Sequence, residues 1–404
     1  MLPAVAFAVL VPITAFAVGR ATRRHVPELV SYLVVGALLG PTGLALIPRD
    51  EFEHLRPLIQ IGTAVLMYLV GERLSLQGFR AARWIVAAAA ASYVATALAV
   101  LVATRFAGGG YALAVVLATL AGGGAPMTIA SIVASRRAAY PDALVAFHGV
   151  CDVFAATAFA AVLPAVVLLS TPGRTVEAAI SQSFRLGLAG IGVGIATAAL
   201  LTHLIGRATG RPRTIAALVV GHVSAAGALC LALGLSVPLC ALVLGAVTAS
   251  RIPAASFTAT FTPFARAEPL LYLLFFTLAG AAIRLDTLPH IGIVGIAFIA
   301  ARTLAKVASG TRTAKVYGFE RARALSFGLD SLPLAGVSVA LAAVASAALP
   351  GRGIATVTLG SVVVFELIGA TIVRLNLHRA LADVPRSTWQ ELSAGKKYAP
   401  PAVE

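Results

Sequence analysis

The stretch that decides the fold is residues 111–135, which read YALAVVLATLAGGGAPMTIASIVAS. It is apolar and long enough to cross a hydrocarbon layer of about 30 Å as an α-helix. Its centre reads GGGAP at positions 122–126, and glycine with proline leaves backbone groups without helical partners. Lipid excludes such groups, whereas a cavity or a protein interior can use them. The stretch is therefore predicted to be a membrane span that is broken near its middle.

A second apolar stretch, residues 324–348, is interrupted in the same way by PLAG at positions 333–336. The two breaks are seven spans apart, and an odd offset turns the second copy upside down in the membrane. We therefore predict two inverted six-helix repeats, about residues 1–169 and about residues 212–374, joined by a linker helix at residues 178–204. The alternative is that both interruptions reflect only close helix packing.

The predicted repeat makes the two discontinuous helices cross near the centre of the membrane. Half-helix dipole ends then surround a central ion or substrate site. The backbone groups expected beside this site belong to Gly124, Pro126, Pro333 and Gly336.

Composition places the chain in a membrane. Of its 404 residues 59% are hydrophobic and 12% are charged, with a mean hydropathy of +0.93, which excludes an ordinary soluble domain. Strand alternation is absent, so we expect an all-α polytopic membrane protein. About thirteen transmembrane helices are predicted, at residues 2–18, 28–47, 57–74, 84–106, 111–135, 143–169, 178–204, 214–234, 235–250, 267–285, 289–311, 324–348 and 353–374. The eighth and ninth touch without a charged loop, so the total can shift by one.

The basic residues predict the topology. Apart from Arg185, Arg302 and Lys306, which lie within spans, 22 of the Lys and Arg residues fall in the odd-numbered loops, the tail or the adjoining span ends, and 6 fall in the even-numbered loops or the adjoining span ends. The positive-inside rule then puts the N-terminus outside and the C-terminus in the cytoplasm, most simply in a bacterial inner membrane. Residues 2–18 lack a basic leader and are interpreted as a first span, not a signal peptide. Residues 1–374 form one transmembrane transporter domain in this interpretation, and residues 375–404 a cytoplasmic tail.

A carboxylate inside an apolar span marks the candidate site. Asp152 lies about ten residues into the span at 143–169, and an ionisable residue at that depth is by default functional. Lys306 and Arg302 lie at a similar depth in the span at 289–311. A buried carboxylate binds either a proton or a cation such as Na⁺ or K⁺, and competition between the two is already an exchange mechanism. The alternative is a static ion pair between Asp152 and one of the two bases.

Other polar residues in the spans are weaker candidates. Asp330 and Glu366 can each pair with Arg302 or Lys306, and a structural role is as expected for them as a transport role. His148 lies one turn before Asp152 and can tune pH dependence, although a lone helix histidine more often packs or forms a hydrogen bond. Thr128 offers an oxygen ligand to a hard cation, although Thr is frequent at helix interfaces.

No enzymatic constellation is found in the sequence. It contains no GxSxG, HExxH or phosphate-binding loop, so we expect neither catalysis nor ATP-driven transport by this chain. The three cysteines lie in apolar segments and lack metal-ligand spacing, so no disulfide, metal or cofactor is expected. The basic residues sit in short loops, which argues against nucleic-acid binding.

Several motifs resemble the monovalent cation:proton antiporter-2 family, which includes Kef-type and sodium/proton exchangers. PELVSYLVVGALLGPTGL at positions 27–44 is similar to the second span of that family, and MYLVG at positions 67–71 to the third. APMT at positions 125–128, followed by Asp152, resembles the broken helix and the ion-binding helix. Residues 362–374 resemble the closing segment, so the likeness covers nearly the whole membrane region.

The resemblance implies a homodimer in which a scaffold holds a mobile six-helix core that carries the ion site. Asp152 matches the ion-binding aspartate of the family, and Lys306, or alternatively Arg302, its basic residue. Two positions depart from the pattern. Cys151 replaces the Asp, Asn or Gln that usually precedes the aspartate, and Glu72 follows Gly71 directly, where the family has its acid one residue later.

Together the residues and the resemblance predict a secondary active transporter that exchanges a monovalent cation, Na⁺ or K⁺, for protons by alternating access. Asp152 is the shared site in this hypothesis, with Thr128 and Cys151 beside it. One alternative is an organic-anion carrier on the same scaffold, in which Lys306 and the half-helix N-termini bind the substrate. The other is a channel or sensor that does not couple gradients.

Overall fold

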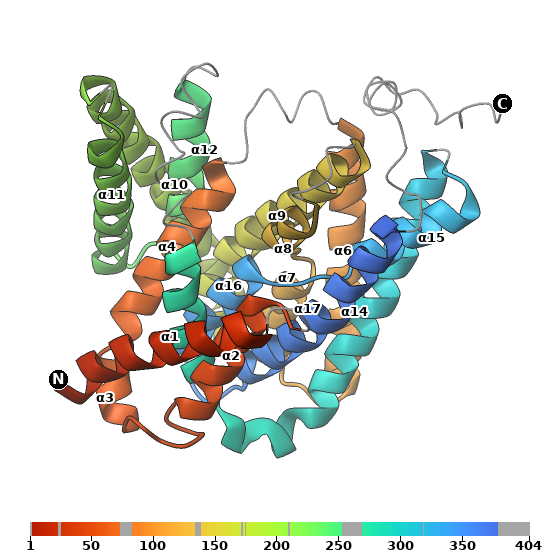
Figure 1. Ribbon diagram of the computed structural model, residues 1–404, viewed down its shortest axis with the longest axis horizontal. Helices are drawn as coiled ribbons and strands as arrows, with labels where there is room; N and C mark the ends of the chain where they lie inside the picture. The colour runs from red at the N-terminus through yellow and green to blue at the C-terminus, as the bar shows by residue number, and fades with distance from the viewer. Residues whose placement is uncertain are drawn as a thin grey trace. The chain divides into compact units, whose positions relative to one another are not determined.

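The computed structural model describes residues 2–22, 26–72, 83–133, 139–170, 173, 175–208, 211–252, 269–317 and 319–378. In these ranges every regular element is a helix (Figure 1). The bounds are α1 (Leu2–Thr22), α2 (Glu28–Leu39), α3 (Arg49–Glu53), α4 (Arg56–Glu72), α6 (Arg83–Phe106), α7 (Tyr111–Ala121), α8 (Pro126–Val133), α9 (Ala139–Leu169), α10 (Val176–Arg207), α11 (Pro212–Ala232), α12 (Val237–Arg251), Pro269–Ala281, the 3-10 helix η1 (Leu285–Thr287), α14 (Leu288–Val316), α15 (Arg321–Asp330), α16 (Gly336–Ala348) and α17 (Ile354–His378).

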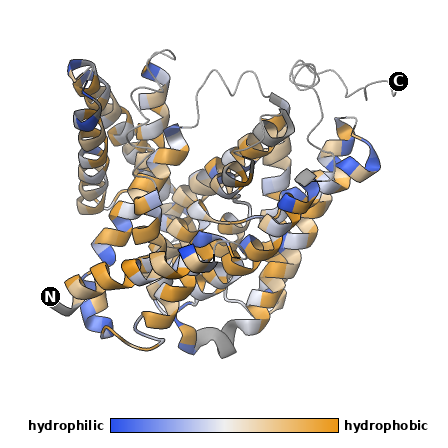
Figure 2. Ribbon diagram, viewed as in Figure 1, coloured by the Kyte–Doolittle hydropathy of each residue, from blue (hydrophilic) through white to orange (hydrophobic). Residues whose placement is uncertain are grey.

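The described helices are those of a membrane protein. Eight helical segments are long and apolar enough to cross a membrane, and α2, α12, α16 and Pro269–Ala281 are shorter apolar helices. Hydrophobic residues cover most of the helical ribbon (Figure 2). The prediction of an all-helical, multi-pass protein is therefore confirmed. Of the predicted tail at 375–404, residues 379–404 lie outside the described ranges.

One predicted span was too long. The sequence predicted a helix over residues 28–47, but α2 ends at Leu39. Gly40 is extended, with ψ −179°, and precedes Pro41, and a residue before proline is biased away from the helical conformation. The apolar residues that follow belong to a loop, so hydropathy alone overestimated the length of this helix.

The chain divides into two compact units. The first comprises Met1–Leu76, Ala156–Ile291 and Val339–Leu359, and the second Gln77–Ala155, Gly292–Ser338 and Gly360–Glu404. Both units draw on residues from distant parts of the sequence. This division into units does not test the predicted boundaries of the repeats, the linker and the single transporter domain, which stay predictions.

In the first unit, α4 and α12 pack backbone against backbone. A Cβ atom at Gly71 would lie 2.0 Å from the carbonyl oxygen of Leu242, and one at Gly245 would lie 2.2 Å from that of Tyr68. No side chain fits in such a space, so both positions need glycine. Close approach through small residues is typical of helix pairs in membranes, where packing replaces the hydrophobic effect.

The same reciprocal contact joins α2 to the helix Pro269–Ala281, also in the first unit. A Cβ atom at Gly36 would lie 2.0 Å from the carbonyl oxygen of Thr277, and one at Gly280 would lie 2.2 Å from that of Leu33. Two helix pairs of this unit are thus held by glycine contacts of the same kind.

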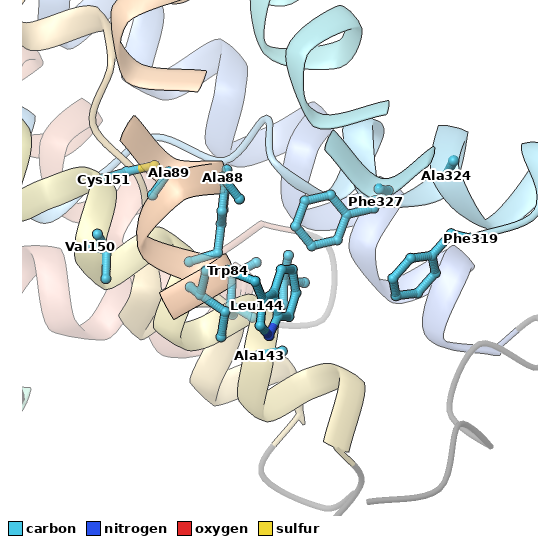
Figure 3. Packing of buried hydrophobic residues seen from close by; sticks show 14 of the residues in the cluster. Trp84, Ala88, Ala89, Ala143, Leu144, Val150, Cys151, Phe319, Ala324 and Phe327 are labelled. Atoms are coloured by element: carbon cyan, nitrogen blue, oxygen red, sulfur yellow. The ribbon is translucent and has the colours of Figure 1, made fainter. Parts of the chain in front are cut away.

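The second unit is built around an apolar cluster that joins α6, α8, α9, α14, α15 and α17. Figure 3 shows the cluster, with Cys151 and Ala89 labelled at one end and Phe319 at the other. Phe147 of α9 meets Phe327 of α15 edge to face, with ring centroids 5.2 Å apart. This packing fixes α9, which carries Asp152, against α15, which ends at the second break.

Candidate ion-binding site

The first break lies in the second unit, between the end of α7 at Ala121 and the start of α8 at Pro126 (Figure 1). Proline is favoured in the first turn of a helix, because its missing N–H needs no partner there. A Cβ atom at Gly124 would lie 2.7 Å from Nδ1 of His148 and 2.9 Å from its carbonyl oxygen. The glycines therefore let the unwound backbone touch α9.

Asp152 lies against this unwound backbone. Its Oδ1 atom accepts a hydrogen bond of 2.8 Å from the amide of Gly124, and the residue is 1% exposed. The amide belongs to the N-terminal end of the half-helix α8, where free N–H groups and the helix dipole favour negative charge. The break thus supplies an amide group that stabilises a carboxylate in otherwise apolar surroundings.

His148 links both breaks through its ring. Nδ1 accepts a hydrogen bond of 3.0 Å from the amide of Ala125, and Nε2 lies 3.0 Å from the carbonyl oxygen of Asp330. A nitrogen that accepts from an amide carries no proton, so Nε2 is the donor and the imidazole is neutral in this arrangement. These contacts favour the hydrogen-bonding interpretation of His148 over a role in pH tuning, which stays a prediction.

Arg302 of α14 bridges the two breaks. Its guanidinium donates to the carbonyl oxygens of Ala121 at 2.9 Å and Gly123 at 3.2 Å in the first break. It also donates to those of Leu332 at 2.6 Å and Pro333 at 3.3 Å in the second. These carbonyls follow the C-terminal ends of α7 and α15, where the helix dipole favours a cation. The fully buried Arg302 thus replaces the helical donors that both breaks remove.

Lys306, one turn further along α14, is the second basic residue that contacts the first break. Its Nζ atom donates to the carbonyl oxygen of Gly122 at 2.9 Å and lies 3.5 Å from Sγ of Cys151. It also lies 5.5 Å from the centre of the Phe147 ring, a weak cation–π contact. Cys151 therefore faces the ammonium of Lys306, as an acceptor much weaker than a carboxylate or amide.

The hydrogen bonds of both basic residues, within the described ranges, go to main-chain carbonyls and to Cys151. An ion pair of either base with Asp152 or Asp330, which the sequence suggested as an alternative, stays a prediction. Oδ1 of Asp330 accepts from the side-chain amide of Asn376 at 2.8 Å. The charges of Arg302 and Lys306 also interact electrostatically with Asp152.

The carbonyls of the first break are consequently occupied. Arg302 and Lys306 cap those of residues 121–123, and the amide of Ala335 donates to that of Gly124 at 3.1 Å. A cation that binds here finds its ligands mainly among side-chain oxygens. The sequence predicted backbone groups of the breaks beside the ion, and this stays a prediction. The amide of Gly124 lies at Asp152, whereas the carbonyl of Pro333 accepts from Arg302.

Thr128 and Glu366 supply two of those side chains. The hydroxyl of Thr128 in α8 donates to Oε2 of Glu366 in α17 at 2.8 Å, and both residues are buried. From the sequence, Glu366 was expected to have either a structural role, paired with a base, or a role in transport, with neither favoured. The signal that could have ranked it higher is the one that singled out Asp152, an acid deep in an apolar span.

Comparison with known proteins identifies the family to which the chain belongs. Residues 5–376 match the family described as "Sodium/hydrogen exchanger, transmembrane". The chain belongs to this family. It is accordingly a cation:proton antiporter, a membrane transporter and not an enzyme. A sequence comparison with curated proteins finds no significant match.

A solved structure shares the fold of this antiporter. The sodium proton antiporter MjNhaP1 from Methanocaldococcus jannaschii, solved at pH 8, matches with a TM-score of 0.72 and 17% sequence identity. The match covers 93% of this chain and 98% of the other. At this identity the match is evidence for the fold, and the roles of individual residues rest on the geometry above.

Proposed function

We propose that Asp152 is the site at which a monovalent cation and protons compete, and that the chain exchanges them by alternating access. The observation that carries this proposal is the contact of its buried carboxylate with the amide of Gly124 at the start of α8. A buried carboxylate that accepts from the amide of Gly124, with the basic side chains of Arg302 and Lys306 in the same unit, can give up a proton to take a cation. Either ligand neutralises it, which lets the loaded site cross an apolar barrier.

Arg302 and Lys306 have a division of roles in this proposal. Arg302, with four hydrogen bonds to carbonyls, holds the breaks together. Lys306 has one carbonyl partner and the weak acceptor Cys151, so it is the more responsive of the two bases. The organic-anion alternative would need Lys306 as a substrate ligand, whereas its ammonium is directed at Gly122.

We further propose the inverted repeat with thirteen spans. Each predicted span contains a described helix when α7 with α8, and α15 with α16, are each taken as one interrupted span. Gly245 lies 209 residues after Gly36, and Gly280 lies 209 residues after Gly71. Two glycine contacts related by one constant offset are what a duplicated unit predicts.

We also propose the branch of the family, the transported cation, the oligomeric state and the membrane. The second-span pattern at positions 27–44 supports the monovalent cation:proton antiporter-2 branch with its Kef-type members, and Na⁺ or K⁺ as the cation. We propose a homodimer in the lipid bilayer of a bacterial inner membrane, with the N-terminus outside, as the distribution of basic residues indicates. No cofactor is expected besides the transported ions.

The test is exchange in proteoliposomes. A pH gradient should drive saturable uptake of Na⁺ or K⁺ by the wild type, and Asp152→Asn should abolish it, because the amide cannot exchange a proton for a cation. Glu177→Gln, in the first turn of α10 outside the site, is the control and should exchange as the wild type does. Undiminished exchange by Asp152→Asn would contradict the proposal, and uptake as a non-saturable conductance would favour a channel.

A further inference from the structure

A second buried carboxylate, Glu366, lies in the unit that contains Asp152. The residue is 0% exposed. Its Oε2 atom accepts the hydrogen bond from Thr128, while Oε1 has no hydrogen-bond partner among the described residues. Buried polar atoms are nearly always satisfied, so an unpartnered carboxylate oxygen needs an explanation.

The surroundings of Glu366 do not stabilise a permanent negative charge. An ionised carboxylate in an apolar interior is costly unless it is paired and hydrogen-bonded. Arg302 of α14 is the charged group that acts on Glu366 among the described residues, and Thr128 of α8 is the polar one. The guanidinium of Arg302 points its hydrogen bonds at four carbonyls of the breaks, not at Glu366. Glu366 therefore needs a proton or a bound cation.

The neighbours of Glu366 suit a small cation. The Thr128 hydroxyl donates its proton to Glu366, and a hydroxyl or carboxylate oxygen is the kind of ligand that a hard cation prefers. Thr128 lies four positions after Gly124, the residue whose amide holds Asp152, a separation of about one helical turn. Asp152 of α9 and Glu366 of α17 thus each accept a hydrogen bond from the segment that forms the start of α8.

The proposed repeat gives this arrangement a simple origin. Glu366 lies on α17, the last span of the second repeat, and Asp152 on α9, the last span of the first. One acid on each of two corresponding helices then serves the same half-helix, α8.

We propose that Glu366, with Thr128, is a second exchangeable proton and cation site, so that each bound cation displaces one proton from Asp152 and one from Glu366. The inference rests on the proposed function, because it assumes that the cation competes with protons at Asp152. In chemical terms, two carboxylic acids release their protons to water and both carboxylates face one monovalent cation.

The experiment counts the protons that a cation releases from purified protein in weakly buffered detergent solution. NaCl or KCl is added and the released protons are followed with a soluble pH indicator, while calorimetry gives the number of bound cations. We expect Glu366→Gln to release one proton fewer per cation than the wild type and to bind the cation roughly tenfold more weakly, the effect of about 1.4 kcal/mol. Choline chloride is the control for ionic strength.

Thr128 provides a second route to the same answer. Thr128→Ser keeps the hydroxyl and should preserve the proton count, whereas Thr128→Val removes it and should weaken cation binding as Glu366→Gln does. This pair tests the site even if Glu366→Gln folds poorly, which gel filtration and thermal unfolding would reveal.

The outcomes separate the two hypotheses. If the wild type releases no protons on adding either cation, the proposed function fails and the inference fails with it. If the wild type releases protons, Asp152→Asn loses the response and Glu366→Gln keeps the full count and affinity, the inference alone is overturned.

Discussion

Charged side chains of the two units have opposite surroundings. In the first unit, Oδ2 of Asp286 lies 2.9 Å from Nη2 of both Arg49 and Arg284, and the three side chains are 42–58% exposed. In the second unit, Arg302 and Lys306 are 0% exposed and donate to main-chain carbonyls. Exposed charges can be paired with one another at little cost, whereas buried ones persist where broken helices leave carbonyls to be satisfied.

This difference shows that the broken helices and the buried basic residues depend on each other for hydrogen-bond partners. Without Arg302, the carbonyls of both breaks would lack donors, and each unsatisfied buried group costs about 1–3 kcal/mol. Without the breaks, a guanidinium in an apolar helix bundle would find no acceptors. The first unit has no such dependence in its described residues, because its helices pack through glycine.

The largest loss of stability is expected for Arg302→Lys. The substitution keeps the positive charge, but a lysine cannot reproduce the four hydrogen bonds of Arg302 to the carbonyls of the two breaks. We expect a destabilisation of about 2–4 kcal/mol, because carbonyls of the breaks are left unsatisfied. Thermal unfolding of the detergent-purified variant measures it. Arg312→Lys, at an exposed position of the same helix, is the matched control, with a change within about 0.5 kcal/mol. Equal stability of the two variants would refute the bridging role.

A smaller loss of stability is expected when a glycine of the first unit is replaced by alanine, which adds a methyl group. Gly245→Ala places a Cβ atom 2.2 Å from the carbonyl oxygen of Tyr68, so α4 and α12 must separate at a cost of about 1–3 kcal/mol. Gly221→Ala in α11 has open space around its Cβ, and there alanine should be neutral or stabilising by up to about 1 kcal/mol. Both are compared by thermal unfolding, and a harmless Gly245→Ala would show that the helices can move apart freely.

A modest effect is expected at Cys151, where the second unit departs from the family pattern. Cys151→Ala removes the sulfur that faces Lys306, and we expect a loss of about 0.5–1.5 kcal/mol. Cys151→Ser, which restores an acceptor, should lose less. If alanine proves as good as serine in unfolding experiments, the sulfur contributes packing and not a partner for the ammonium.

The smallest effect is expected at the exposed ion pairs of the first unit. The hydrogen bond from Arg284, with a second from Arg49, lowers the pKa of Asp286 from 3.8 to about 2. A lowered pKa means that its stabilising contribution is present above about pH 4 and disappears as the pH falls towards about 2. Asp286→Asn should therefore change the unfolding temperature slightly at neutral pH, less near pH 2, and not at all well below pH 2. An equal change at both pH values would show that charge is not its cause.

Much of the helical pattern was predictable from local sequence. GGGAP at 122–126 and PLAG at 333–336 indicated the two interruptions, and the helices do end at Ala121 and Asp330 and resume at Pro126 and Gly336. Glycine and proline act on their own backbone, so their effect is visible without neighbours. The end of α2 at Leu39 was missed, because hydropathy outweighed the turn signal of Gly40 and Pro41.

The partners of the buried groups were not predictable. Arg302 and Lys306 were expected to face an acid, and Asp330 was a candidate, yet the acceptors are carbonyls and Asp330 meets Asn376. A main-chain carbonyl is present at every residue, so sequence cannot indicate which one a distant base will reach. Glu366 was ranked low for the same reason, because its contact with Thr128 joins residues 238 positions apart.

The sequence by itself determined that this chain is a helical membrane protein with two interrupted spans and an acid, Asp152, deep in a third. Those features follow from hydropathy, from the backbone chemistry of glycine and proline, and from the cost of a charge in lipid. The tertiary structure decided how that cost is met, by bringing Gly124 to Asp152, Arg302 to both breaks and Thr128 to Glu366. The physical reason is that hydrogen bonds between distant helices depend on how the helices pack, which a local pattern does not contain.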